Sequence, residues 1–262
     1  MLPTKKTKFN QDILSVILIG VVLMTGIVMI VFSALNSSSF LAILGVSVAF
    51  WSVLLLFFTP TKHTFLSLLK ASASAGGSNI ERSLIEFNSE EKGVYLPPQN
   101  LRNFESSLIF VPKTNRTDLP TSNETNDKLF TEKKNGLLLT PPGLALSMVF
   151  EQELGLSFRK INLPQMQIMI AKLIHNLKFA EDARVQIKDK TITLEVTGSI
   201  FNTLCQETRS SQPRTHAQVG CILASAFACA FAKASDKPVT FQKDTLNPET
   251  KTLIIEYRME EV

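Results

Sequence analysis

One long stretch of this chain, residues 13–58, contains no Asp, Glu, Lys, Arg or His. Within it, residues 13–35 and 40–58 are both strongly apolar, and the short polar segment Asn36-Ser37-Ser38-Ser39 separates them. A helix needs about 20 apolar residues to cross a bilayer core of about 30 Å. The sequence therefore predicts two membrane spans, which so short a link forces into an antiparallel hairpin. The pattern excludes a wholly soluble protein and a polytopic transporter.

Cationic side chains flank both predicted spans. Lys5, Lys6 and Lys8 lie in a basic tail over residues 1–12, whereas Lys62 and Lys70 follow the second span. Because cytoplasmic flanks carry the excess of Lys and Arg, we expect a two-span protein of the cell membrane with both termini in the cytoplasm. A cleaved signal peptide is the alternative for the first span, but its apolar core is usually only about 7–15 residues long.

Two further features bear on this hairpin. Ala42, Gly45, Ala49 and Ser52 form a stripe of small residues on the second span, which favours close packing against the first span over a dimer contact. Asn-X-Thr triplets at residues 115–117 and 123–125 are of the glycosylation type, and glycosylation there would invert the expected topology.

The rest of the chain divides by composition. Residues 61–112 are expected to form a juxtamembrane region with short extended segments and a short helix ending at Phe87, opened by a capping box of Ser78 and Glu81. Residues 113–135 are polar and predict a flexible loop. Residues 136–262 predict an α+β domain with an antiparallel sheet.

The periodicity of the α+β domain predicts the order helix, helix, hairpin, helix, helix, hairpin. The helices are expected over residues 144–154, 163–179, 199–206 and 215–234. The first hairpin turns at Asp189-Lys190, which places Ile187 opposite Ile192, Val185 opposite Leu194 and Arg184 opposite Glu195. The second hairpin turns at Asn247-Pro248-Glu249.

This order resembles the 4-vinyl reductase domain and the related small subunits of the TRAPP trafficking complex over residues 144–258. The resemblance is carried by residues 187–201, by Gly220-Cys221 at the start of the apolar helix, and by Lys237-Pro238-Val239 before the last hairpin. It implies a small or acyl-chain ligand in an apolar pocket, or protein contacts, often in a dimer. Many 4-vinyl reductase domains carry cysteines in the last hairpin; residues 242–247 have none, so no metal role is carried over.

The whole chain also looks like uncharacterised archaeal two-span membrane proteins. Tyr95-Leu96-Pro97-Pro98 and Thr140-Pro141-Pro142-Gly143 carry that likeness, and it implies no activity.

The three cysteines, Cys205, Cys221 and Cys229, are few and odd in number, which predicts a reducing compartment without a disulfide framework. Small buried residues are the simple interpretation, and a pocket thiol is the functional one, with Cys221 near its helix start the best candidate. On one continuous helix His216 lies about 140° around from Cys221, a poor geometry for a nucleophilic pair. No metal-ligand spacing, phosphate loop or nucleophile motif occurs, so we assign no catalytic residue, metal or cofactor.

We therefore expect a non-enzymatic, membrane-anchored cytoplasmic domain that binds a small apolar or acyl ligand or a protein partner. Its alternatives are a dimeric scaffold that recruits a partner to the membrane and a thiol-dependent acyl-transfer enzyme. The lipid bilayer and a second copy of the chain are the other expected partners; the near balance of charge beyond residue 60 excludes nucleic acid. The expected pocket is lined by the bulky faces of two helices, with Met169, Leu173, Val219, Cys221, Leu223, Phe227 and Phe231.

Overall fold

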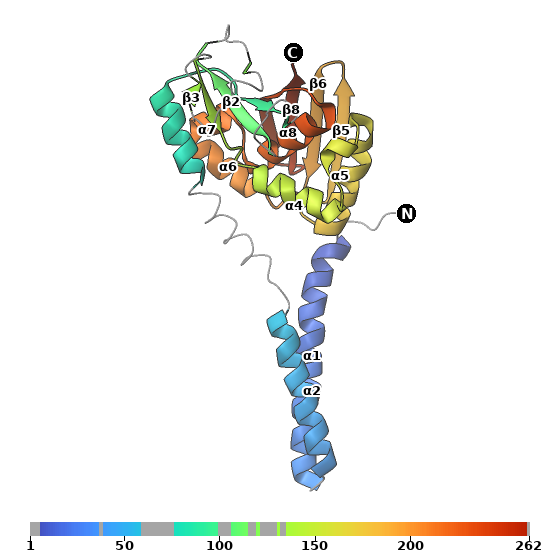
Figure 1. Ribbon diagram of the computed structural model, residues 1–262. Coiled ribbons are helices and arrows are strands. Elements are labelled where there is room, and N and C mark those ends of the chain that lie inside the picture. The colour runs from blue at the N-terminus through green and yellow to red at the C-terminus, as the bar shows by residue number, and fades with distance from the viewer. Residues whose placement is uncertain are drawn as a thin grey trace. The chain divides into compact units, whose positions relative to one another are not determined.

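The computed structural model describes residues 6–36, 39–58, 76–98, 106–114, 119–120, 130–131 and 135–260. The chain divides into two compact units, Met1–Ser67 and Leu68–Val262. In Figure 1 the blue helices belong to the first unit and the sheet with its helices to the second. The cationic residues 62 and 70 and both glycosylation-type triplets of the loop lie outside the described residues.

The first unit contains two helices, α1 (Lys6–Asn36) and α2 (Ser39–Phe58). They approach each other closely at two glycines. A Cβ atom on Gly26 would lie 2.9 Å from the backbone nitrogen of Ala49, and one on Gly45 would lie 2.9 Å from the carbonyl oxygen of Gly26. The small residues of α2 therefore face α1, where Ser52 is also buried. In this structure the stripe therefore packs on α1 through Gly45 and Ala49, which lie close to Gly26.

Among the described residues, one helical stretch, Pro213–Ser235, is long and apolar enough to cross a membrane. Of its most apolar part, 83% is buried inside the protein. Such burial is typical of a core helix. The described apolar parts of α1 and α2, Gly20–Asn36 and Ser39–Leu54, are shorter. The structure thus shows two apolar helices that pack on each other. Their insertion in a bilayer stays a prediction.

The second unit is built on an eight-stranded antiparallel sheet with the order β3-β4-β2-β1-β7-β8-β6-β5. The strands are β1 (Val94–Leu96), β2 (Leu108–Pro112), β3 (Phe130–Thr131), β4 (Gly136–Leu139), β5 (Asp182–Lys188), β6 (Thr191–Thr197), β7 (Val239–Asn247) and β8 (Thr252–Met259). The α+β class and the antiparallel sheet are as predicted.

The boundary expected at residue 136 is not a boundary in the structure. β1 and β2 come from the segment that was expected to be juxtamembrane, yet β1 pairs with β7 through Val94 and Thr240. β2 in turn pairs with both β1 and β4. Residues 76–260 therefore contribute to a single domain, and a fragment starting at residue 136 would lack two central strands.

The predicted register of the first hairpin is confirmed. Ile187 pairs with Ile192, Val185 with Leu194 and Arg184 with Glu195. Three of the four apolar side chains are buried, whereas Ile187 near the turn is 37% exposed. Alternation of apolar and polar residues is thus sufficient here to fix which face of the hairpin enters the core.

A bulge in the second hairpin changes which side chains of β7 face the helices. Phe241 pairs with Tyr257, but Asp244 pairs with Ile255, because the register shifts between Phe241 and Lys243. Tyr257 and Ile255 are both buried. The extra residue therefore turns Asp244 toward the helix-covered side, where regular alternation would have placed Lys243.

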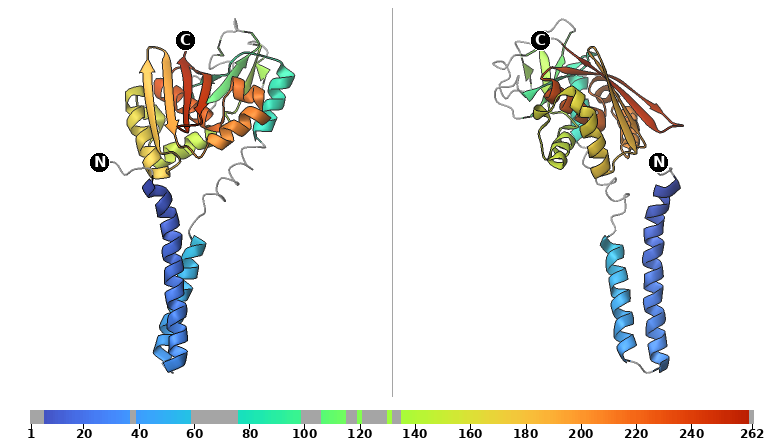
Figure 2. Two further views of the ribbon diagram at one scale, coloured as in Figure 1. Left: turned by 180° about the vertical axis from the view of Figure 1, so that it is seen from behind. Right: turned by 90° about the vertical axis from the view of Figure 1, so that its right-hand side faces the viewer.

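The helices cover one side of the β5–β8 half of the sheet, as the left view of Figure 2 shows with the orange and red strands in front of them. The central helix is α8 (Ile222–Ser235), in which every side chain from Leu223 to Lys233 is buried. Two tyrosine hydroxyls attach this segment to the sheet. Tyr95 Oη donates to Val219 O at 2.7 Å, and Tyr257 Oη donates to Ala224 O at 2.9 Å.

The two helices before the first hairpin were predicted closely. α4 (Leu144–Leu154) has the expected bounds, and α5 (Leu163–Leu177) begins where expected and ends two residues early, at the left-handed Lys178. Asn162 and Gln165 form a capping box at the start of α5. A one-turn helix, η3 (Phe158–Lys160), lies between α4 and α5.

The helices after the first hairpin differ from the prediction. α6 (Asn202–Ser211) starts later and runs further than expected. The single helix expected over 215–234 is two helices, α7 (Pro213–Gln218) and α8. The break lies at Gly220, whose φ of 89° is readily adopted only by glycine. His216 and Cys221 are therefore not on one helix, and the 140° argument against their proximity does not hold.

Candidate functional site: a cavity beside a disulfide

The residues predicted to line a pocket form the core of the second unit. Six of the seven are fully buried or nearly so (Leu173, Val219, Cys221, Leu223, Phe227 and Phe231), and Met169 is half-buried. Phe227 packs on Phe150 with ring centroids 5.3 Å apart, and Phe231 packs on Tyr257 at 5.3 Å. The cavities found in the described structure have other linings. Ligand binding by these seven residues stays a prediction.

A cavity of about 470 Å³ lies elsewhere in the second unit, outside the sheet–helix core. Its walls come from the helix over residues 76–87, the segment after β4, α6, α7 and the start of α8. The lining residues are Gly76, Gly77, Asn79, Ile80, Ser83, Leu139, Thr140, Pro141, Pro142, Leu204, Thr208, Gln212, Thr215, Gly220 and Ile222. The volume falls within the range of about 300–1,000 Å³ that is typical of small-molecule sites.

The lining of this cavity is uncharged. Its apolar part comprises Ile80, Leu139, Leu204, Ile222 and two prolines, and the other side chains end in hydroxyl or amide groups. Desolvating a charged ligand would require a charged or strongly polar partner. The wall therefore suits a neutral, largely apolar molecule.

The hydroxyl groups in the wall already donate hydrogen bonds to the protein. Ser83 Oγ donates to Asn79 O at 3.0 Å, and Thr208 Oγ1 donates to Leu204 O at 2.9 Å. Because each hydroxyl has one proton and two lone pairs, the oxygens can still accept a bond from a ligand. The site can thus accept a hydrogen bond from a ligand, although its lining carries no charged side chain.

Glu81 joins two walls of the cavity. Its carboxylate, only 9% exposed, accepts from Arg214 N at 3.1 Å and from both N and Oγ1 of Thr215 at 2.7 Å. The predicted role of Glu81 at the start of its own helix is therefore wrong; it satisfies donors at the start of α7 instead. Gly77 supports the same junction, because a Cβ atom there would collide with the side chain of Gln212.

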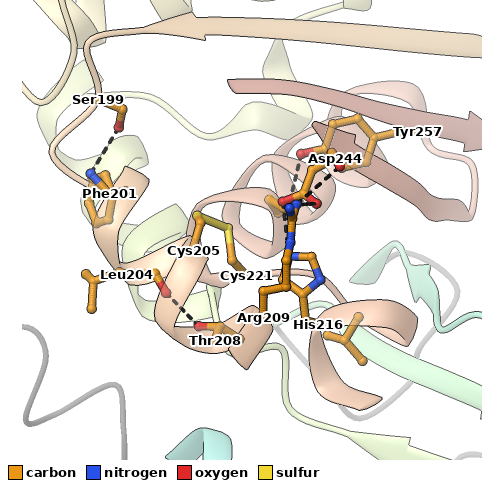
Figure 3. The surroundings of a disulfide bond; sticks show 12 residues. Ser199, Phe201, Leu204, Cys205, Thr208, Arg209, His216, Cys221, Asp244 and Tyr257 are labelled. Carbon is orange, nitrogen blue, oxygen red and sulfur yellow. Dashed lines mark hydrogen bonds and ion pairs between the residues drawn. A yellow bond between two sulfur atoms is a disulfide. The ribbon is translucent and has the colours of Figure 1, made fainter. Parts of the chain in front are cut away.

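Cys205 and Cys221, which are chain neighbours of the lining residues Leu204, Gly220 and Ile222, form a disulfide, shown in Figure 3. It joins α6 to the residue that precedes α8, and its Cα atoms are 5.1 Å apart. The expectation of no disulfide is wrong, because the low and odd number of cysteines does not reveal that α6 and the start of α8 bring Cys205 and Cys221 together. As a disulfide partner Cys221 cannot serve as the reactive pocket thiol. The remaining thiol, Cys229, is fully buried, and burial raises its pKa to about 12.

Arg209 and His216 converge on Asp244, as Figure 3 shows. Arg209 Nη2 lies 2.7 Å from Asp244 Oδ1, and His216 Nε2 lies 3.2 Å from Asp244 Oδ2. Burial raises the pKa of Asp244, but the hydrogen bonds and charges of His216 and Arg209 outweigh burial and leave that pKa below its usual value. The cluster links α6 and α7 to the bulged strand β7; regular alternation along β7 would have placed Asp244 on the other face of the sheet.

Among the described residues, no three His, Cys, Asp or Glu side chains lie close enough together to hold a metal ion. Of the three histidines, His175 is exposed, His216 is buried, and His63 lies outside the described residues.

Comparison with known proteins gives one finding on kinship. A family model described as Domain of unknown function (DUF7982) matches residues 2–259. The curated proteins and the solved structures yield no match. The likeness to the 4-vinyl reductase and TRAPP domains stays a prediction, as does that to archaeal membrane proteins.

Proposed function

We propose that this chain, which belongs to the DUF7982 family, is a membrane-anchored, non-enzymatic binding protein whose α+β domain holds a neutral, largely apolar small molecule. The observation that carries the proposal is the uncharged cavity of about 470 Å³ between the helix 76–87 and α6–α8. Its size and its mixture of apolar and hydrogen-bonding groups are those of small-molecule sites. Its lining includes none of the seven residues expected on the faces of α5 and α8.

The anchor in this proposal is the pair α1 and α2. Their outward side chains are large and apolar: Met24 is 61% exposed, Val28 61%, Phe40 75% and Trp51 61%. In water such a surface would be unfavourable, whereas hydrocarbon solvates it. The uncharged link and the basic residues that flank the apolar stretches support a topology with both termini in the cytoplasm.

The state of the thiols argues against the acyl-transfer alternative. Cys205 and Cys221 are joined, and Cys229 is buried with a raised pKa, so a thiol-dependent acyl transfer lacks a nucleophile. The likeness to the 4-vinyl reductase superfamily supports binding of a small ligand, and we keep it as part of the proposal.

A dimeric scaffold is the second candidate function. Met148 and Val149 on α4 and Ile168 on α5 are 52%, 44% and 66% exposed, on two helices that pack together. Exposed apolar side chains of this size are typical of protein contact surfaces. Sedimentation of the full chain in detergent tests this candidate: a monomer at every concentration would refute it.

The binding proposal is tested by photolabelling the full chain, in nanodiscs, with a neutral aryl diazirine. Ile80 lines the cavity, whereas Ile85 on the same helix is 51% exposed and lies outside the lining. Ile80→Trp fills the cavity and Ile85→Trp is the matched control. We expect labelling of peptides containing Leu204 and Ile222 to fall at least about tenfold in Ile80→Trp, a loss of about 1.4 kcal/mol of binding, and to persist in Ile85→Trp. Equal labelling of both variants would refute the proposal.

A further inference from the structure

We propose that the Cys205–Cys221 disulfide is a reversible redox lock on the cavity: the oxidised form holds α6 against the start of α8, and reduction releases α6. This inference rests on the proposed function for its biological meaning, but release of α6 is measurable on its own. It assigns to the two cysteines a regulatory role in place of the pocket-thiol role that the sequence suggests.

The disulfide is placed where it can act on the cavity wall. Leu204, which precedes Cys205, lines the cavity, and so do Gly220 and Ile222 on either side of Cys221. A displacement of α6 from α8 therefore moves lining residues directly. Thr208, one turn after Cys205, would move with them.

The helix α6 buries few side chains. Only Leu204 and Cys205 are buried, so half of its buried side chains are in the disulfide. Its polar contacts include the ion pair of the 49% exposed Arg209 with Asp244 and the bond that Asn202 Nδ2 donates to Lys251 O at 3.1 Å. Elements with little buried apolar surface open locally at low cost. Without the disulfide, α6 is the element of the cavity wall most prone to open.

The neighbouring helix α7 provides a contrast. Three hydrogen bonds to the buried carboxylate of Glu81 hold Arg214 and Thr215, and these bonds do not depend on the cysteines. Reduction is therefore expected to loosen α6 while α7 and the helix 76–87 stay in place. The cavity would open on one side and would not collapse.

The chemistry requires an external thiol reductant of the dithiol or glutathione class. One thiolate attacks a sulfur of the disulfide and forms a mixed disulfide, and a second thiol resolves it. The net reaction converts the disulfide and two reductant thiols into two cysteine thiols and one oxidised reductant. Cys229 does not exchange with the pair, because it is fully buried and its pKa is about 12. In a cytoplasmic domain a disulfide is typically redox-sensing, which fits the proposed topology.

Access to the buried sulfurs follows from the same opening. Cys205 is 3% exposed and Cys221 is fully buried, so the reductant must act on a state in which α6 has moved. Reduction is therefore expected to be slow in the native chain. A ligand in the cavity packs against Leu204 and should slow it further.

The test uses the full chain in nanodiscs and follows hydrogen exchange of α6 by mass spectrometry, with and without dithiothreitol. Closing a loop of about 15 residues restricts an open chain strongly, so we expect exchange of the 202–211 amides to accelerate by up to about 100-fold on reduction. Cys205→Ser should show the fast exchange without reductant. Cys229→Ser, which leaves the disulfide intact, should match the wild type in both conditions.

Two results would overturn the redox lock: unchanged exchange of α6 on reduction, or alkylation of all three cysteines in denatured, never-reduced protein. The diazirine labelling of the cavity is read in the same samples and tests a different statement. If α6 accelerates while the cavity is unlabelled in both states, the binding function fails and the lock stands. If the oxidised cavity is labelled and α6 does not respond, the function stands and the lock fails.

Discussion

Replacing Lys233 by Met should destabilise the second unit, because it leaves the carboxylate of Glu151 without its ion-pair partner. Lys233 lies on the core helix α8 and is 6% exposed. Its Nζ atom is 2.8 Å from Oε2 of Glu151 on α4, so this ion pair joins the two helices under the sheet. Methionine keeps the apolar stem of the side chain and removes the charge, so the variant isolates the ion pair from the packing.

The expected cost follows from the burial of the partner. Removing one member of a fully buried pair costs about 3–5 kcal/mol. Glu151 keeps 18% of its side chain exposed and still accepts from Ser157 Oγ at 2.9 Å and Phe158 N at 2.8 Å, so water and these donors offset part of the loss. We expect about 2 kcal/mol, equivalent to about 4–8 °C in Tm for a domain of this size.

The pH dependence has a definite sign. Burial raises the pKa of Glu151, but Lys233 together with the Phe158 and Ser157 donors outweighs burial, so the folded-state pKa lies below the usual 4.5. The charged carboxylate therefore stabilises the wild type above the unfolded pKa, and this contribution is lost as pH falls through the lower folded pKa. In Lys233→Met, protonation removes the unpaired charge. The stability gap between the two proteins should narrow in acid.

The assay is thermal and urea unfolding of residues 68–262 at pH 7 and at pH 3 for the wild type, Lys233→Met, Glu151→Gln and the double variant. The double variant should lose less than the sum of the two single losses, because it buries no unpaired charge. A cost below about 0.5 kcal/mol for Lys233→Met, or strict additivity, would show that the pair does not hold α4 to α8.

Three further predictions concern other parts of the same domain. Gly143→Ala should destabilise by at least about 2 kcal/mol in urea unfolding, because its Cβ atom would collide with the backbone of α8, whereas Gly76→Ala in open space should not destabilise; equal effects would contradict the close approach. Asp244→Asn should lower stability at pH 7 by about 1–2 kcal/mol and remove an acid loss that sets in as pH falls below 3.8, since the folded pKa of Asp244 is lowered; an unchanged acid profile would refute it. Cys229 should react with iodoacetamide at pH 8 at least about 100-fold more slowly in native than in denatured protein, and equal rates would contradict its burial.

Local pattern was enough to predict the parts of the fold whose contacts are close in sequence. The alternation in residues 182–197 fixed both the strands and their register. The helical spacing of Met166, Ile170 and Leu173 fixed the buried face of α5. In both cases one side of the element is apolar, and a slip of one residue would expose it.

Features that depend on distant contacts were missed. The pairing of β1 with β7 joins residues far apart in the chain, and nothing in the short segment 94–96 indicates it. The bulge that turns Asp244 inward is likewise absent from the simple alternation of β7. The sequence did contain a signal for the break between α7 and α8, because Gly220 interrupts an otherwise apolar helical pattern. This break accompanies the contact of Cys221 with Cys205.

The lining of the cavity was not predicted. The expected pocket lay on the most apolar helix faces, Phe227 and Phe231 among them, and these faces are buried in the core. The strongest apolar patterns identify what the protein buries for its own stability. The cavity has a mixed lining from segments that periodicity treats separately, so no single stretch reveals it.

The central claim, that the cavity holds a neutral apolar molecule, is tested most directly by mass spectrometry of what copurifies with the full chain. The account predicts a neutral compound with the wild type and with Ile85→Trp, and its loss from Ile80→Trp, in which the cavity is filled. Finding no such compound, or finding it retained equally by Ile80→Trp, would contradict the account.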